Sequence, residues 1–569
     1  MKNRPLYEVR KIRDFKDMLQ QSVSLFGDRP AFLVKKERGG PYTEITFKEY
    51  SNDVNALGTA LLRLAGAGSR VAILAETRYE WYVSYLAVTN GVGVVVPLDK
   101  ELPGLEIASM LNRAEANVLI YSAAKQELVG GIMDQIPGVK KFICMDRPEG
   151  REGILYFWDL VEEGRRLLAE GERSFLDATV DPEAMTILLF TSGTTDKAKA
   201  VMLCQRNICS NIEGMCAMIY SDENDRFLSV LPLHHTYECT CGFLTEIYRG
   251  SSIAICEGLL HIQQNIKESK PTILLVVPLM LEMFHRAIMK KAQATPQMAR
   301  KFAFARKLSK FLLFFGIDLR RKIFAPVHEN FGGRLRLIIS GGAPIDPKIL
   351  SDIQELGIAC LQGYGLTECS PILAVNRDVY FKNHAAGLPM PGVEIRVINK
   401  DEDGIGEFIA RGPNVMLGYY KDPEATAEAI DEEGFFHTGD LGYIDEDGFV
   451  IITGRKKNVI VLKNGKNIYP EEIEALLLQS PYVCEVVVSG EDCGRDDLVL
   501  TATIFPDMEA VQEALGAEPS REAIQALLEE EVRKVNEKLV AYKRIRRVIY
   551  RDTEFEKTTS RKIRRQYKK

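Results

Sequence analysis

The 569-residue chain lacks several features that would place it in a broad class at once. Its longest apolar runs, at 272–284 and 311–317, fall short of the ~20 residues that a membrane-spanning helix needs. The segment after Met1 has no apolar core of the kind found in signal peptides. Glycine (44) and proline (24) are at ordinary levels, which excludes a fibrous or low-complexity chain. We therefore expect a globular cytoplasmic protein that is soluble or, at most, peripheral at the inner membrane surface.

The chain also lacks the marks of a metal framework or of nucleic-acid binding. Among its eleven cysteines the closest pair, Cys239 and Cys241, is separated by one residue, and no second pair accompanies it. We therefore expect buried free thiols in a reducing compartment. With 73 Lys and Arg against 79 Asp and Glu, the formal net charge is −6, which argues against a dedicated nucleic-acid binder.

The small net charge hides two basic stretches. Residues 285–324 carry eleven Lys or Arg and one Asp, a local charge of +10. Residues 543–569 carry twelve Lys or Arg against three Asp or Glu, a local charge of +9. The remaining residues must therefore carry −25 in total, so we expect an acidic body with two basic surfaces.

The distribution of apolar residues predicts an α/β fold. Short β-branched runs alternate with helical patterns in two sets, before about residue 150 and from about 226 to 363, as in parallel sheets covered by helices. From about Gly387 the apolar and polar residues alternate, which is typical of antiparallel strands. We predict a large N-terminal domain, 1–455, of doubly wound α/β subdomains plus a small antiparallel β-barrel region. A small α+β C-terminal domain, 456–569, follows it.

A phosphate-binding segment is predicted after the strand at 187–190. No Walker-type loop occurs in the chain, but Thr191 opens a run of four hydroxyl residues around Gly193, and Lys197 and Lys199 follow. Hydroxyl and backbone N–H groups donate to phosphate oxygens, and a lysine supplies a compact positive charge. Read alone, the segment also suits a flexible surface turn.

At this segment the chain begins to resemble the adenylate-forming (AMP-binding) superfamily, which includes acyl-CoA synthetases and luciferases. The run from Thr191 to Thr195, with Lys199, fits the phosphate loop of that superfamily, whereas Asp196, Ala198 and Ala200 stand where Gly, Pro and Gly are usual. By this resemblance the nucleotide-binding residues of the loop are Thr191, Ser192, Gly193, Thr194, Thr195 and Lys199. Thr195 is also expected to take part in catalysis.

Further motifs follow in the order of the superfamily. His235, in the segment 231–236, is expected beside the carboxylate substrate. Glu368 ends the most specific motif and is expected to bind Mg²⁺, which prefers carboxylate and phosphate oxygens. Tyr364 is expected to stack on adenine and Thr367 to hold the α-phosphate. The nucleotide-binding residues implied by these motifs are Gly341, Gly342, Ala343, Pro344, Gln362, Gly363, Tyr364, Gly365 and Thr367.

The C-terminal motifs complete the resemblance. Asp440 matches a ribose-hydroxyl acceptor, Arg455 a residue near ribose and phosphate, and Lys457 the pivot of a hinge. Lys562 fills the position of a catalytic lysine, which also contacts the nucleotide, although Arg561 replaces the usual Gly before it. The resemblance implies that the small domain is mobile and rotates at this hinge between two half-reactions.

The resemblance implies a ligase that uses ATP, Mg²⁺ and CoA. A carboxylate would attack ATP to give an acyl-adenylate and pyrophosphate, and a thiol would then displace AMP. Amino-acid-activating relatives carry an Asp after the segment equivalent to 231–235, which this chain lacks, and 281–333 resembles a segment of long-chain fatty acyl-CoA synthetases. We therefore expect a medium- or long-chain fatty acid. Transfer to a carrier protein and a nucleotide-binding relative without activity remain alternatives, and the oligomeric state stays open.

The basic stretch near 300–315 predicts an amphipathic helix. Its apolar residues at helical spacing are Phe302, Ala305, Leu308, Leu312 and Phe315, with Lys301, Arg306, Lys307 and Lys310 between them. Two interpretations stay open: a core-facing helix with a solvated basic side, or a helix that lies on an anionic membrane as a peripheral contact.

Overall fold

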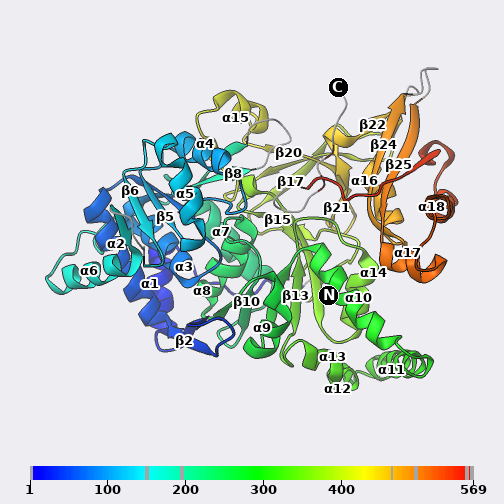
Figure 1. Ribbon diagram of the computed structural model, residues 1–569, viewed down its shortest axis with the longest axis horizontal. Coiled ribbons are helices and arrows are strands. Elements are labelled where there is room, and N and C mark those ends of the chain that lie inside the picture. Colours follow the sequence, from blue (N-terminus) through cyan, green and yellow to red (C-terminus); the bar gives the residue numbers. More distant parts are fainter. Residues whose placement is uncertain are drawn as a thin grey trace. The chain divides into compact units, whose positions relative to one another are not determined.

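The computed structural model describes residues 4–147, 153–191, 198–462, 466–492, 498–557, 563 and 565. The chain forms two compact units (Figure 1), a large one of Met1–Ile395 with Ala410–Phe436 and a small one of Arg396–Ile409 with His437–Lys569. The domain boundary predicted between residues 455 and 456 and the hinge with its pivot at Lys457 both stay predictions.

The large unit is built on two sheets. Their strand orders are β16-β15-β14-β13-β12-β10-β11-β1-β2 and β19-β9-β8-β4-β3-β5-β6-β7. The first sheet contains β1 (Pro30–Lys35), β2 (Tyr42–Thr46), β10 (Arg226–Ser229), β11 (Ser252–Ile255), β12 (Ile273–Val276), β13 (Leu337–Ser340), β14 (Ala359–Gly365), β15 (Ile372–Val375) and β16 (Leu388–Pro389). The second contains β3 (Ser69–Leu74), β4 (Gly93–Pro97), β5 (Val118–Tyr121), β6 (Lys141–Cys144), β7 (Ile154–Tyr156), β8 (Met185–Thr191), β9 (Lys199–Cys204) and β19 (Gly418–Tyr419).

Both sheets are parallel in the middle and antiparallel at one or both ends. In the first sheet the six central strands pair in parallel, in the order β14, β13, β12, β10, β11 and β1. The strand β2 at one end and the strands β15 and β16 at the other are antiparallel. In the second sheet β3 to β8 are parallel, and β9 and β19 are antiparallel. The parallel centres confirm the β-α-β alternation read from the sequence.

Helices connect the strands of the large unit. They are α1 (Phe15–Phe26), α2 (Phe47–Ala65), α3 (Tyr79–Ala87), α4 (Gly104–Ala114), α5 (Gln126–Ile132), α6 (Phe157–Ala169), α7 (Gln205–Met218), α8 (Thr245–Arg249), α9 (Ile262–Ser269), α10 (Pro278–Ala292), α11 (Pro296–Phe314), α12 (Arg320–Ile323), α13 (Ala325–Asn330), α14 (Pro347–Glu355) and α15 (Pro423–Ala429). Local sequence sets several of their ends. For α2, Thr46 and Glu49 form a capping box, in which each side chain bonds the backbone N–H of the other residue.

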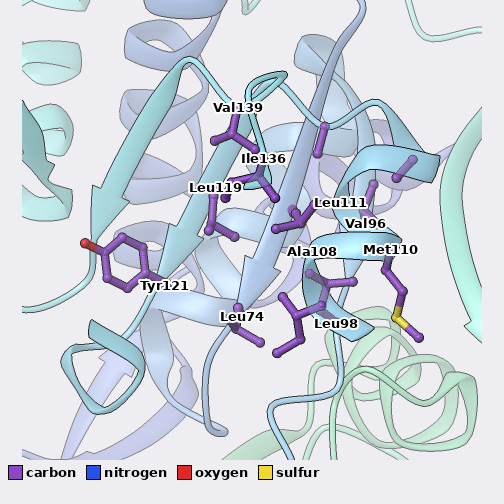
Figure 2. Packing of buried hydrophobic residues seen from close by; sticks show 14 of the residues in the cluster. Leu74, Val96, Leu98, Ala108, Met110, Leu111, Leu119, Tyr121, Ile136 and Val139 are labelled. Atoms are coloured by element: carbon purple, nitrogen blue, oxygen red, sulfur yellow. The ribbon is translucent and has the colours of Figure 1, made fainter. Parts of the chain in front are cut away.

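Each sheet buries an apolar face. In the second sheet Leu74, Val96 and Leu119 face Ala108 and Leu111 of α4 (Figure 2). A second cluster fills the first sheet around Leu274 and Ile338. Because parallel strands buried on both faces need continuous apolar runs, these clusters explain the β-branched segments of the sequence. The ten described cysteines are free thiols, and all but Cys484 are buried.

The small unit contains most of a four-stranded sheet and the C-terminal α+β part. The sheet has the order β17 (Glu394–Ile398), β18 (Gly406–Arg411), β20 (Phe436–Ile444) and β21 (Val450–Arg455). Among the described strands this sheet is open, with β17 and β21 at its edges, whereas the sequence predicted a small antiparallel β-barrel region. Alternation alone cannot distinguish the two, because closure depends on which edge strands pair.

The C-terminal part has its own core. Its elements are β22 (Ile460–Val461), β23 (Asn467–Ile468), α16 (Pro470–Leu477), β24 (Val483–Asp492), β25 (Leu498–Pro506), α17 (Met508–Leu515), α18 (Arg521–Asn536) and β26 (Arg547–Tyr550). β24, β25 and β26 form one sheet, and its residues Val486 and Ala502 share a buried cluster with Leu477 of α16 and Leu528 of α18. This arrangement confirms the small α+β architecture expected after the large unit.

Candidate active site

The candidate nucleotide residues follow two neighbouring parallel strands. β13 and β14 are in register, with Ser340 beside Gln362. The segment 341–344 therefore leaves the sheet next to the Gly-rich end of β14. The carboxyl ends of parallel strands are where α/β sheets bind ligands. Two of the predicted motifs thus meet at one sheet edge.

The glycines of these motifs serve different purposes. A Cβ on Gly341 would lie 2.8 Å from the ring of Tyr237, whose hydroxyl donates to the Ile339 carbonyl at 3.0 Å. A Cβ on Gly365 would lie 1.8 Å from the Pro371 carbonyl oxygen. Gly342 differs, because it has a φ of +87° and open space where a side chain would be. Of the three, Gly342 offers the backbone surface expected against an adenine.

Some of the predicted residues around Gly342 are exposed to solvent, and others are buried or contact neighbouring residues. Ala343 and Pro344 are exposed, whereas Tyr364 is buried with 9% of its surface accessible. The Gln362 side chain donates to the Asn383 carbonyl at 2.7 Å. Gly363 packs closely against β15, since a Cβ on it would lie 3.3 Å from the Ala374 carbonyl oxygen.

Two buried asparagines fix the turn that carries Thr367 and Glu368. The side chains of Asn211 and Asn414 both donate to the carbonyls of Cys369 and Ile372, at distances of 2.9–3.3 Å. The Glu368 carbonyl also accepts from the Met416 amide at 2.8 Å. Because each buried amide nitrogen donates to two carbonyls of the turn and the Met416 amide holds a third, the position of the Glu368 backbone is determined from both sides of the turn. Thr367 and Glu368 themselves are half-buried.

Tyr419 joins two of the predicted site residues. Its hydroxyl donates to Glu368 Oε1 at 3.1 Å, and the ammonium of Lys199 lies 4.5 Å from the centre of its ring. Burial, and then the nearby Glu368 carboxylate, raise the pKa of the Tyr419 phenol well above its usual value. The phenol is therefore a permanent donor to Glu368, and the structure brings the predicted metal ligand and the predicted phosphate lysine to the same tyrosine.

The hairpin of β8 and β9 places both ends of the predicted phosphate loop. Thr191 pairs with Lys199 across the hairpin, and its hydroxyl donates to the Lys199 carbonyl at 3.4 Å. The predicted residues Ser192, Gly193, Thr194 and Thr195 lie outside the described residues. The end of the loop at Lys199 therefore lies beside Tyr419, because β19 pairs with β9.

The described residues fit a Mg²⁺ ion that is shared with a nucleotide. They contain no group of three or more His, Cys, Asp or Glu side chains arranged to hold a metal. Mg²⁺ is usually held by one or two carboxylates together with substrate phosphates and water. Glu368 is half-buried and accepts one hydrogen bond from Tyr419, which leaves its carboxylate with acceptor capacity for a cation.

The two adjacent histidines lie close together after β10. The ring centres of His234 and His235 are 4.1 Å apart, and Nε2 of His234 lies 3.6 Å from Oδ2 of Asp99. Burial, with the neighbouring His235 as a smaller cause, lowers the pKa of His234 well below its usual value. His234 is therefore neutral at physiological pH. His235 lies two residues before Tyr237, whose ring lies against Gly341. This places His235 near the carboxyl end of β13, where the nucleotide is expected.

A buried acid follows the histidines and was not predicted from the sequence. Glu238 is fully buried and accepts a hydrogen bond from the Ser229 hydroxyl, which itself accepts from Tyr82 at 2.9 Å. Burial raises the pKa of Glu238 to about 8. Glu246, one helical segment later, has its pKa raised to about 8 for the same reason. Both acids are therefore largely protonated at neutral pH.

The small unit brings two predicted residues together. Asp440 of β20 pairs in register with Arg455 of β21, and their side chains form an ion pair of 2.7 Å. Asp440 is 3% exposed. The adjacent Lys456 is paired with Glu407 at 2.7 Å. The predicted ribose acceptor and the predicted phosphate residue therefore form one charged pair on two neighbouring strands.

The tail that contains Lys562 is described only in part. Lys562 lies outside the described residues, but its neighbour Ile563 forms a bridge with Lys557. Arg565 is ion-paired with Glu474 of α16. Burial raises the pKa of Glu474 to about 7, and the Arg565 charge opposes that shift. The segment on both sides of Lys562 is thus attached to the small unit.

A separate pocket of about 730 Å³ lies beyond the ends of β1, β3 and β11. Basic groups line it, but each of the following is paired: Lys35 with Glu257, Arg78 with Glu80, and Arg165 with Asp53. Since their charges are already compensated, these groups make a poor phosphate site. The pocket therefore does not compete with the strand ends around Gly342 as a nucleotide site.

Comparison with known proteins assigns the family. Residues 19–420 match the family described as "AMP-binding enzyme", and residues 457–568 match "AMP-binding enzyme C-terminal domain". The human protein named long-chain-fatty-acid–CoA ligase 1 is 30% identical over 532 residues, which is 86% of this chain and 73% of that protein. The protein of the same name from Cavia porcellus is 29% identical over 547 residues, covering 89% and 75%.

Solved structures agree with the fold. The crystal structure of the anthranilate CoA ligase AuaEII in complex with anthranoyl-AMP matches with a TM-score of 0.76 at 22% identity, over 98% of this chain and 96% of that one. At this identity the likeness concerns the fold alone. The family is shown by the match over residues 19–420. The chain belongs to the AMP-binding enzyme family.

Proposed function

We propose that this AMP-binding enzyme is an ATP-dependent ligase that joins a medium- or long-chain fatty acid to CoA. The observation that carries the proposal is the 30% identity, over 86% of the chain, with a human protein named long-chain-fatty-acid–CoA ligase 1. The convergence of Glu368, Tyr419 and Lys199 supports the ATP-dependent part of the reaction.

The first half-reaction forms an acyl-adenylate. A carboxylate oxygen of the fatty acid attacks the α-phosphorus of ATP, and the bond to the bridging oxygen breaks so that pyrophosphate leaves with its electron pair. Negative charge grows on the phosphoryl oxygens and on the leaving group. Lys199, Thr191 and the loop that contains Thr195 offset the charge on the leaving group. Glu368 would hold a Mg²⁺ ion, which would supply additional neutralisation of phosphate charge.

Tyr419 acts here as a positioning residue. Its hydroxyl holds one oxygen of Glu368, and its ring lies under Lys199. The two charged groups are therefore oriented before a nucleotide binds. Preoriented charges cost less reorganisation when the transition state forms.

The small unit supplies the remaining groups. Lys562 contacts the attacking carboxylate and the α-phosphate, and Asp440 accepts the ribose hydroxyls. Asp440 is paired with Arg455, so a nucleotide shares or replaces that ion pair. In the second half-reaction the CoA sulfur attacks the acyl carbon, the bond from that carbon to the AMP oxygen breaks, and the thiol proton is released. A rotation at Lys457 separates the two steps.

A fatty acid is the proposed substrate because the chain lacks the Asp that amino-acid-activating relatives carry after the segment equivalent to 231–235, where this chain has Thr236 and Tyr237. His234 is neutral, and the buried Glu238 is largely protonated at neutral pH. These two neutral side chains are compatible with an acyl chain. His235 lies beside the substrate carboxylate in this proposal.

The location of the enzyme is part of the proposal. No helix in the described ranges is both long and apolar enough to cross a bilayer. We place the enzyme in the cytoplasm, with a peripheral membrane contact near residues 300–315.

The proposal is tested by product formation. The full-length chain is incubated with ATP, Mg²⁺, CoA and one acid at a time, from short to long chain length, and acyl-CoA, AMP and pyrophosphate are measured. We expect the three products in equal amounts, with the highest kcat/KM for a medium- or long-chain acid. Release of pyrophosphate with no thioester, even at high CoA, would contradict CoA as the acceptor. Such a result would direct the test to carrier proteins.

A further inference from the structure

The helix α11 has two apolar faces, of which only one is used for packing. Phe302 and Ala305 pack against the core of the first sheet, and the ring of Phe302 lies 5.8 Å from that of Phe324. Arg306, on the same side, forms ion pairs with Asp352 and Glu355 of α14. These contacts attach α11 to the large unit.

The opposite face carries an outer stripe of Phe304, Leu308, Phe311 and Phe315. Their spacing of four, three and four residues places them on one line along the helix. Their exposed fractions are 68%, 38%, 61% and 62%. Phe314, at the end of the helix, is 85% exposed and lies 5.4 Å from the ring of Phe315. Contiguous exposed aromatic residues of this kind mark a surface that binds something apolar.

Basic side chains surround the outer stripe. Arg300, Lys301 and Lys307 are exposed, and no ion pair with the described part of the chain compensates them. Lys310 differs, since it is paired with Glu355 at 2.7 Å. The stripe therefore combines exposed phenylalanines with available positive charges.

We propose that the outer stripe of α11 docks the protein on an anionic lipid bilayer. The four apolar side chains enter the interfacial region, while Arg300, Lys301 and Lys307 contact lipid headgroups. Helices with Phe and Leu on one side and Lys or Arg around them bind membranes in this way. A protein partner fits less well, because lysine is depleted in protein–protein interfaces and the stripe has lysines along its border.

This inference rests on the membrane contact proposed above, for which it names the helix face and the lipid charge, and it does not depend on the ligase activity. The stripe, its exposure and its charges are observed whatever reaction the enzyme performs. If the substrate is a fatty acid, docking has a clear use, because long-chain acids partition into bilayers. Binding can nevertheless be measured without any substrate.

The test is flotation of the full-length chain with lipid vesicles. One set contains phosphatidylcholine alone, and the other adds about 30 mol% phosphatidylglycerol. The apolar variant is Phe304→Ser/Phe311→Ser, and the charge variant is Lys301→Glu/Lys307→Glu. The matched controls are Leu105→Ser/Leu260→Ser, two exposed leucines elsewhere, and Lys48→Glu/Lys267→Glu, two exposed lysines elsewhere.

We expect the wild type and both controls to float with anionic vesicles and weakly with neutral ones. Each Lys near an anionic surface contributes about a fivefold gain in binding, so the charge variant should bind at least roughly 25-fold more weakly. The apolar variant should bind at least about tenfold more weakly to both vesicle types. Thermal unfolding of each variant shows whether it is folded.

Two results would overturn the proposal. Equal flotation of the wild type and the apolar variant would show that the stripe does not enter the bilayer. The second is a wild type that never floats but is a dimer by light scattering and becomes monomeric in the apolar variant. In that case a second copy of the chain covers the stripe.

Discussion

The turn around Glu368 and the outer stripe of α11 lie in the same unit, yet they differ in how their side chains are covered. The polar groups of the turn have hydrogen-bond partners inside the protein, whereas the apolar groups of the stripe face solvent. At the turn, Asn211, Asn414 and Tyr419 supply hydrogen bonds that fix the carboxylate. On α11 the apolar side chains of the outer stripe remain 38–68% exposed in the described chain. A fixed polar site suits chemistry, which needs preoriented charge, whereas an uncovered apolar stripe suits binding to a separate phase. We therefore expect the two regions to be separable by mutation.

The largest expected effect lies outside both regions, at Lys562. Lys562→Ala removes the positive charge proposed at the attacking carboxylate, so acid-dependent exchange of pyrophosphate into ATP should fall by at least about 10³-fold. ATP binding, measured by calorimetry, should remain. Lys568→Ala is the control for a lost charge in the same tail. Exchange near the wild-type rate would remove Lys562 from the mechanism.

Glu368→Gln should affect the chemistry and leave the membrane contact intact. The amide keeps the shape and the bond from Tyr419 but loses the charge, so exchange should fall about 100-fold and need more Mg²⁺. Glu424→Gln, at an exposed position of α15, is the matched control. Flotation with anionic vesicles should not change. Weakened flotation of this variant would show that the two regions are not independent of each other.

Tyr419→Phe tests the positioning role of Tyr419 and should reduce activity less than Glu368→Gln does. It removes the hydroxyl that bonds Glu368 but keeps the ring under Lys199. We expect about a tenfold loss in kcat together with a higher Mg²⁺ requirement, and a larger loss for Tyr419→Ala. A merely structural role would instead lower the unfolding temperature and leave the Mg²⁺ dependence unchanged.

The smallest effect on activity is expected from the buried acids, which act on stability. Burial raises the pKa of Glu238 and Glu246 to about 8, so the folded state holds protons that the unfolded state releases above about pH 4.5. Their contribution to stability is therefore complete below that pH and is lost as the pH rises to about 8. Each group should lower the unfolding free energy by up to about 1.4 kcal/mol per pH unit in this window.

Urea unfolding between pH 5 and 8 checks this expectation. Glu238→Gln should flatten the pH dependence, because the amide does not titrate. Glu106→Gln, an exposed carboxylate on α4, should leave the dependence as in the wild type. If the unfolding free energy depends on pH equally in both variants, Glu238 is not protonated in the folded state.

The sequence predicted those parts of the fold and site that depend on local patterns. The runs at β3, β4 and β12 are continuous apolar segments, and Lys199 and Glu368 stand in recognisable motifs. Tyr419 was missed, because its contact with both residues depends on β19 pairing with β9, more than 200 residues away along the chain. Asn211 and Asn414 were missed for the same reason, since they act through the tertiary structure.

The helix α11 shows a second limit of sequence patterns. The spacing that we used joined Phe302 and Ala305 with Leu308 and Phe315 as one face. The structure confirms the helix but places the first two on the core and the last two on the outside. Because this helix carries phenylalanines on both sides, its period alone cannot tell which face is buried.

The central claim is that the chain itself forms an acyl-adenylate, and pyrophosphate–ATP exchange tests it most directly. The full-length chain is incubated with ATP, Mg²⁺ and labelled pyrophosphate, without CoA and with one fatty acid at a time. We predict exchange that requires both the acid and Mg²⁺ and that is absent in Lys562→Ala. No exchange with any acid, in protein that still binds ATP, would contradict the account.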